Sequence, residues 1–151
     1  MYYLAEIIFT EFKFSIEVIL LFVARSQELF QLAGAMKQSN HAALVYGKRR
    51  VGKTRLIKEA LKAQTKTAIY YECIKGTVKE NVDAFVKVLL EERVLPFTSS
   101  FDTFQYVFAF LNSLSREFVV VIDEYPYLST FVEPKKIDSI FQSIVDTRLG
   151  N

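Results

Sequence analysis

The chain of 151 residues has little of what builds covalent or metal-centred sites: one cysteine, one histidine and no tryptophan. A single cysteine, Cys73, excludes an intrachain disulfide and favours a reducing compartment, so we expect a cytoplasmic protein. Cys73 ends an apolar run and is interpreted as a core thiol. His41 has no second histidine or cysteine at a metal-ligand spacing, so we interpret it as structural.

The chain also has no large excess of charge of either sign, because 19 basic and 17 acidic residues leave a net charge of only +2. Such a small net charge does not support binding to nucleic acid, although a local cluster of basic residues keeps nucleic-acid binding as an alternative. The fractions of hydrophobic (51%) and charged (24%) residues are those of a globular chain of one-domain size. Fourteen phenylalanines and eight tyrosines predict an aromatic interior.

Long hydrophobic runs are missing as well. In the N-terminal part the longest uncharged stretch is Val18–Ala24, far shorter than the roughly 20 residues that span a bilayer, so we predict no membrane span. Neither the basic start nor the small-residue cleavage site of a signal peptide is visible. Residues 1–21 are therefore an apolar extension, and periodicity does not decide whether its runs Leu4–Phe9 and Ile16–Val23 are strands or a helix.

The most informative stretch is Gly47–Thr54, which fits the phosphate-binding P-loop pattern G-x-x-x-x-G-K-[ST]. A strand-like run, His41–Tyr46, precedes it, and a helical apolar stripe beginning at Leu56 follows it. Glycines let the backbone approach a ligand, and the amides that open the helix point at phosphates. Lys53 can reach the β- and γ-phosphates, and the Thr54 hydroxyl can ligate Mg²⁺. The candidate nucleotide-binding residues are Gly47, Lys48, Arg49, Arg50, Val51, Gly52, Lys53, Thr54 and Arg55.

A second informative stretch is Phe118–Glu124, whose five leading apolar residues predict a strand buried on both faces and hence a parallel sheet. Asp123 and Glu124 end this strand, where open α/β sheets place their ligands. An aspartate there can hold Mg²⁺, and a glutamate beside it can act as general base on a water. We therefore predict Thr54 and Asp123 as metal ligands, and Glu124 and Lys53 as catalytic residues.

Apolar periodicity predicts the remaining elements. One further strand is expected over Thr67–Cys73. Helices are expected from about residue 26 to residue 37, across 82–90 and 101–114, and over 137–145.

Together these segments resemble the archaeal-type AAA-like P-loop ATPases. The resemblance rests on Val45–Thr54, which contains the Walker A motif Gly47–Thr54, and on Val121–Leu128, which overlaps the Walker B motif Val119–Glu124. It also rests on Phe22-Val23-Ala24-Arg25 with Glu28-Leu29, which is similar to the family's N-terminal Phe-x-Gly-Arg and Glu-Leu motif. Ala24 replaces the usual glycine. The resemblance covers residues 22–151 and implies an α/β P-loop NTPase domain with a parallel sheet of additional-strand, catalytic-glutamate type, in strand order 5-1-4-3-2. It also implies ATP and Mg²⁺ as ligands.

The family's sensor strand, fourth in that numbering, would begin near the end of this sequence, so we expect an incomplete ATPase domain. Arg116 and Arg148 are the candidates for an arginine finger. The gap expected between the P-loop strand and the acidic strand must close or be filled, and the two N-terminal runs or a second copy of the chain are the candidates to fill it. Three alternatives stay open: an ATPase acting on a protein partner or through self-association, a nucleotide-binding switch with little turnover, and an inactive fragment.

Overall fold

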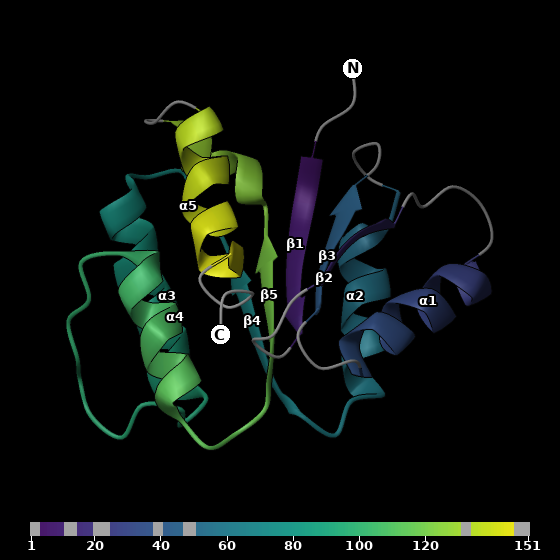
Figure 1. Ribbon diagram of the computed structural model, residues 1–151, viewed down its shortest axis with the longest axis horizontal. Helices are drawn as coiled ribbons and strands as arrows, with labels where there is room; N and C mark the ends of the chain where they lie inside the picture. Colours follow the sequence, from purple (N-terminus) through teal and green to yellow (C-terminus); the bar gives the residue numbers. More distant parts are fainter. Residues whose placement is uncertain are drawn as a thin grey trace.

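The computed structural model describes residues 4–10, 15–19, 25–37, 41–46, 51–130 and 134–146. In this part of the chain five strands form one sheet in the order β2-β3-β1-β5-β4, and helices cover both of its faces (Figure 1). The strands are β1 (Leu4–Thr10), β2 (Ser15–Ile19), β3 (His41–Tyr46), β4 (Thr67–Glu72) and β5 (Phe118–Asp123). The helices are α1 (Arg25–Lys37), α2 (Lys53–Lys62), α3 (Val78–Glu91), α4 (Phe104–Ser113) and α5 (Pro134–Asp146), with a short 3₁₀ helix η1 (Tyr125–Thr130).

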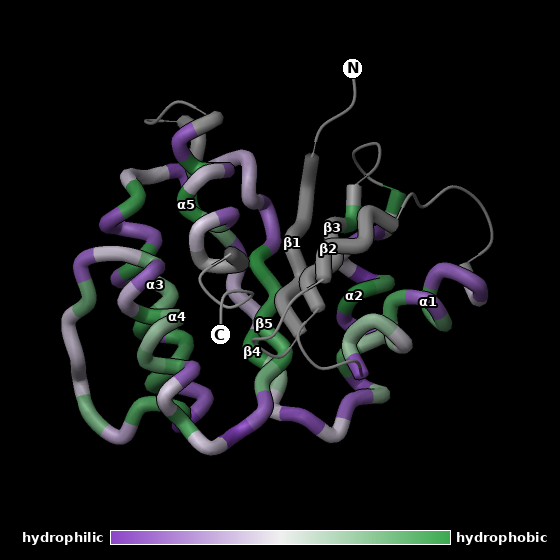
Figure 2. Tube along the Cα trace, in the orientation of Figure 1, coloured by the Kyte–Doolittle hydropathy of each residue, from purple (hydrophilic) through white to green (hydrophobic). Residues whose placement is uncertain are grey.

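Strand β5 separates two hydrophobic cores. All six of its residues are buried, as the run of β-branched residues predicts. Successive side chains point to opposite faces, so Phe118, Val120 and Ile122 belong to one core. Val119 and Val121 belong to the other. In Figure 2 the trace of β5 is coloured mainly as hydrophobic, in agreement with its burial.

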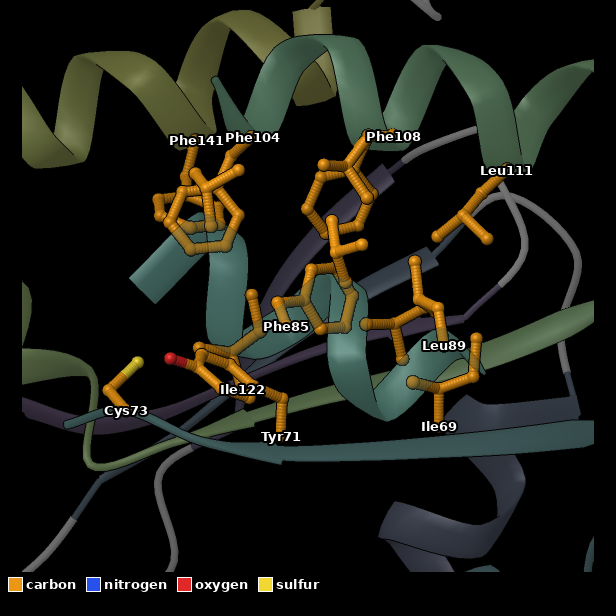
Figure 3. Packing of buried hydrophobic residues seen from close by; sticks show 14 of the residues in the cluster. Ile69, Tyr71, Cys73, Phe85, Leu89, Phe104, Phe108, Leu111, Ile122 and Phe141 are labelled. Atoms are coloured by element: carbon orange, nitrogen blue, oxygen red, sulfur yellow. The ribbon is translucent and has the colours of Figure 1, made fainter. Parts of the chain in front are cut away.

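The larger core lies under α3, α4 and α5 and is rich in phenylalanine. Phe85 from α3 sits between Phe104 and Phe108 of α4, with ring centroids 6.0 and 5.9 Å away. Phe141 of α5 stacks 5.3 Å from Phe104 and closes the layer (Figure 3). The smaller core lies under α1 and α2, and includes Leu32, Met36, Ile57 and Ala60. The predicted aromatic interior is therefore confirmed, and it is concentrated on one face.

Strand β1 fills the gap expected between the P-loop strand and the acidic strand. Its backbone pairs with β3, from Thr10 opposite His41 to Leu4 opposite Tyr46, and with β5, where Ile7 lies opposite Ile122. Figure 1 shows β1 between these two strands. The N-terminal run is thus a central strand, and β2 extends the sheet beyond β3.

The prediction of an all-parallel sheet is wrong, because β1 runs antiparallel to both neighbours. The pairs β2–β3 and β4–β5 are parallel, as expected for this fold class. The direction of β1 follows from its short connection, residues 11–14, to β2. Four residues can cross the roughly 10 Å between next-nearest strands, but cannot also return along a strand of about 17 Å. Because β2 is parallel to β3, β1 must run the other way.

The predicted helices and the strand over Thr67–Cys73 are confirmed, with small shifts at their ends. The helix expected over 101–114 begins at Phe104, because the Thr103 hydroxyl accepts a hydrogen bond from the Tyr106 amide and caps it. Helix α3 begins with a capping box between Thr77 and Glu80. No helix among the described residues has the length and apolar character needed to cross a membrane.

We expect Ile8→Pro to abolish or severely weaken folding, because proline removes a ladder hydrogen bond from the middle of the sheet. The loss of that bond and the clash of the ring should lower the free energy of unfolding by at least about 2–3 kcal/mol. Ile8→Val is the matched control, since it keeps the amide and the β-branched shape. Urea unfolding followed by circular dichroism measures both variants. Equal midpoints for the two variants would show that β1 is not a sheet strand.

Candidate functional site

The carboxylate of Asp123 joins the two sequence motifs. Its side chain is buried, with an exposed fraction of 2%, at the end of β5. The Thr54 hydroxyl donates a hydrogen bond to Asp123 Oδ2 at 3.0 Å, across 69 positions of sequence. Thr54 lies in the first turn of α2, whose buried Ile57 and Ala60 pack against the β5 residues Val119 and Val121. Packing of α2 on β5 therefore places the predicted metal ligands side by side.

Only the second half of the predicted P-loop belongs to the described residues, because Gly47, Lys48, Arg49 and Arg50 lie outside them. Gly52 is the N-cap of α2 and has φ 87°, a left-handed conformation that glycine adopts without strain. Val51 and Arg55 are exposed, whereas Lys53 and Thr54 are half-buried. The strand–glycine–helix arrangement expected around the motif is present in β3, Gly52 and α2.

The start of α2 is arranged for an anion. Gly52 has no side chain with which to cap the helix, and the first turn contains no acidic residue. The first turn instead carries the cations Lys53 and Arg55. Positive charge at the N-terminal end of a helix opposes the helix dipole and costs stability. A bound anion would accept hydrogen bonds from the uncapped amides and would offset the unfavourable energy of the two cations.

Glu124 follows Asp123 in a conformation that is rare for residues other than glycine. Its φ is 53°, and its backbone N–H donates a 2.7 Å hydrogen bond to Asp123 Oδ1. Its carbonyl accepts a hydrogen bond from the Tyr127 amide at 2.9 Å, which starts η1. The turn therefore holds the Asp123 carboxylate by its second oxygen, and it places Glu124 half-exposed beside it.

Sequence reasoning missed one member of the site, Tyr70, which was interpreted only as part of an apolar strand. Its hydroxyl donates a hydrogen bond to Asp123 Oδ2. Lys58 of α2 lies over the Tyr70 ring, 4.8 Å from the centroid. The doublet Tyr70-Tyr71 at the end of a strand was the available signal, because one of two successive side chains must face the P-loop helix.

The loop after β4 borders the site and is held rigidly. Asn81 of α3 is fully buried, and its Oδ1 accepts hydrogen bonds from the Tyr71 hydroxyl at 2.7 Å and the Ile74 amide at 2.9 Å. Its Nδ2 donates to the carbonyls of Ile74 and Thr77 at 3.1 and 3.0 Å. Asn81 thus ties the loop to α3, and the Cys73 amide bonds the Asp123 carbonyl at 2.8 Å.

The single thiol belongs to the core, as predicted. Cys73 has an exposed fraction of 2% and packs in the larger core. Burial, with the nearby Asp123 carboxylate, raises the pKa of Cys73 far above its usual range. The protonated thiol is a poor nucleophile, so the geometry gives Cys73 no catalytic role.

Arg116 is not near the site. Its guanidinium donates to the Thr67 hydroxyl at 3.1 Å and lies over the Phe118 ring. These contacts are at the beginning of β4 and β5, whereas Asp123 is at the end of β5, about 17 Å away for a strand of this length. Arg116 therefore cannot reach Asp123 within one chain. Arg148, the other candidate, lies outside the described residues.

The oxygen atoms of Thr54 and Asp123 fit a magnesium ion better than a transition metal. Among the described residues no cluster of three histidine, cysteine, aspartate or glutamate side chains could hold a metal by itself. Magnesium commonly takes one or two protein oxygens and completes its shell with phosphates and water. The Asp123 carboxylate and the Thr54 hydroxyl, 3.0 Å apart at the N-terminal end of α2, meet that requirement.

Residues 22–150 match the family described as an ATPase domain predominantly from Archaea. The chain belongs to this family, which confirms the resemblance drawn from its motifs. No curated protein and no solved structure matches the chain. The matched segment begins after β1 and β2, although both strands belong to the same sheet as β3 and β5.

Because Glu124 has φ 53°, we expect Glu124→Gly to be more stable than Glu124→Ala by about 1 kcal/mol. Chemical denaturation of the two variants measures the difference. The matched control is Lys87, an exposed residue within α3, where glycine should be less stable than alanine by about 1 kcal/mol. The same sign at both positions would contradict the left-handed turn at Glu124.

Proposed function

We propose that this chain is an ATP-binding domain that holds ATP and Mg²⁺ at the end of β3 and β5 and hydrolyses the nucleotide. The observation that carries the proposal is the hydrogen bond between Thr54 and Asp123, because it unites the two motifs at one place. Membership of an ATPase family supports the same reading. The uncapped, cationic start of α2 supports a phosphate ligand there.

The sheet fits the proposal when its strands are compared with the expected order 5-1-4-3-2. We assign β3 to position 1, β5 to position 3 and β4 to position 2, in line with their order in the sequence. We propose that β1 and β2 take positions 4 and 5, with β1 reversed in direction. Backbone pairing on both sides of β1 then maintains the spacing between the P-loop strand and the acidic strand.

Each side chain has a separate role in the proposed reaction. Lys53 and the amides at the start of α2 bind the phosphates, with Gly47–Arg50 as the rest of the loop. Thr54 and Asp123 would hold the magnesium ion, which neutralises phosphate charge when bound. Glu124 orients a water and accepts its proton as the water oxygen bonds to the γ-phosphorus and the bond to the β-phosphate oxygen breaks. Val51 and Arg55 flank the phosphates at the exposed start of the helix.

A second candidate, a nucleotide-dependent switch with slow turnover, is favoured by the position of Arg116. An arginine that stabilises the transition-state charge contributes about 10³–10⁵ in rate to related reactions. Arg116 is held by Thr67 and Phe118 at the end of β4 and β5 that lies opposite to Asp123. Turnover by one isolated chain would then be slow even with every nucleotide-binding residue in place.

Paired variants separate binding from chemistry. Lys53→Ala should weaken ATP affinity about 10- to 100-fold, because it removes a charge-assisted contact of about 1.5–3 kcal/mol. Glu124→Gln should keep that affinity but lower turnover by about 10²–10⁴. Calorimetric titration with ATP and Mg²⁺, together with single-turnover phosphate release, measures both quantities.

Lys87→Ala is the matched control for loss of a lysine, since Lys87 is an exposed residue of α3, which covers the opposite face of the sheet from α2. Equal ATP affinity for wild type and Lys53→Ala would overturn the proposed phosphate site. Unchanged turnover in Glu124→Gln would remove the glutamate from the reaction. Binding without measurable turnover in the wild type would leave the switch as the function.

A further inference from the structure

Tyr70 reaches Asp123 because of the strand register. Strands β4 and β5 are parallel, with Tyr70 opposite Val121 and Glu72 opposite Asp123. Tyr70 packs with the core that contains Val121, on the α2 side of the sheet. Tyr71 faces the other core and α3. Tyr70 is therefore the diagonal neighbour of Asp123 on one face, at a distance that a long aromatic side chain can cross.

Donors from α2, from β4 and from the turn after β5 converge on the buried carboxylate. Asp123 Oδ2 accepts from the Thr54 hydroxyl of α2 and from the Tyr70 hydroxyl of β4. Asp123 Oδ1 accepts from the Glu124 amide in the turn after β5. Hydrogen bonds to an ionised acceptor are about twice as strong as neutral ones, and three of them fix the plane of the carboxylate.

Helix α2 also holds the tyrosine itself. Lys58 comes one turn after Thr54, so both side chains lie on the same side of α2. The Lys58 ammonium sits over the Tyr70 ring at 4.8 Å. Tyr70 is thus fixed at its ring by Lys58 and at its hydroxyl by Asp123, and it links α2 to β5 through β4.

We propose that Tyr70 is a positioning residue: its hydroxyl holds Asp123 Oδ2 against Thr54 in the nucleotide-free protein, so that the site for the Mg²⁺ of a bound nucleotide is formed before the ligand arrives. This inference rests on the proposed function. Without the Tyr70 hydroxyl the Asp123 carboxylate can rotate about its χ2 bond. Mg²⁺ must then order the carboxylate when it binds, and the free energy that this requires lowers the affinity for Mg²⁺. Nucleotide binding that does not involve the metal is unaffected.

The test is the Mg²⁺ dependence of nucleotide binding in Tyr70→Phe, which loses one hydroxyl and keeps the ring under Lys58. Binding of a fluorescent ATP analogue is titrated with Mg²⁺, and then repeated in excess EDTA. We expect the half-saturating Mg²⁺ concentration to rise about 10-fold, since one hydrogen bond to a charged group is lost. In EDTA the affinities of variant and wild type should agree.

Tyr71→Phe is the matched control. It removes the neighbouring hydroxyl, which bonds Asn81 on the opposite face, and so it lowers stability without touching Asp123. Its half-saturating Mg²⁺ concentration should equal that of the wild type. A purely structural Tyr70 would shift the unfolding midpoint and leave the Mg²⁺ dependence in place.

An unchanged or lower Mg²⁺ requirement in Tyr70→Phe overturns the inference; the lower value would mean that the phenol competes with the metal. An equal increase in Tyr71→Phe overturns it too, because the effect would then follow from lost stability. Failure of the wild type to bind the ATP analogue at all contradicts the proposed function instead, so the two failures are distinguishable.

Discussion

The backbone pairing of β5 on both sides is the constraint on which the other features depend. A strand with every residue buried has no access to water, so each of its N–H and C=O groups must bond inside the sheet. Strand β4 satisfies one side and β1 the other. Without β1, the bonds left unmade at about 1–3 kcal/mol each would consume the whole stability of a small domain. The N-terminal strand is therefore a central strand of the sheet.

The site follows from the same strand. Alternation along β5 sends Asp123 to the face of α2 after Val119 and Val121 have anchored that helix. The register with β4 then places the Tyr70 hydroxyl against the Asp123 carboxylate. The left-handed turn at Glu124, directly after β5, places the Glu124 amide against the other oxygen of the same carboxylate. A buried charge of this kind is tolerated only when it is hydrogen-bonded. Because the buried Asp123 carboxylate needs hydrogen-bond donors, it links the elements that supply them: α2, β4 and the turn before η1.

Much of this arrangement was predictable from local patterns. The helices, the buried strand ending at Asp123, and the meeting of Thr54 with Asp123 follow from apolar periodicity and from two motifs of known geometry. The direction of β1 was not predictable, because it depends on β1 and β2 lying on the two sides of β3, and this strand order is not encoded in local patterns. Tyr70 was missed because a diagonal contact depends on the register between two strands, which composition does not encode. The strained turn at Glu124 has no signal in a residue type that rarely adopts it.

Native-state hydrogen exchange of single amides measures the central position of β1 most directly. Exchange from strands of one sheet core requires global unfolding, whereas frayed segments exchange through local opening. If β1 pairs with both β3 and β5, amides of Glu6–Phe9 and of Val119–Ile122 should exchange with free energies of opening that agree within about 1 kcal/mol. Protected β5 amides alongside rapid exchange in Glu6–Phe9 would contradict a central β1.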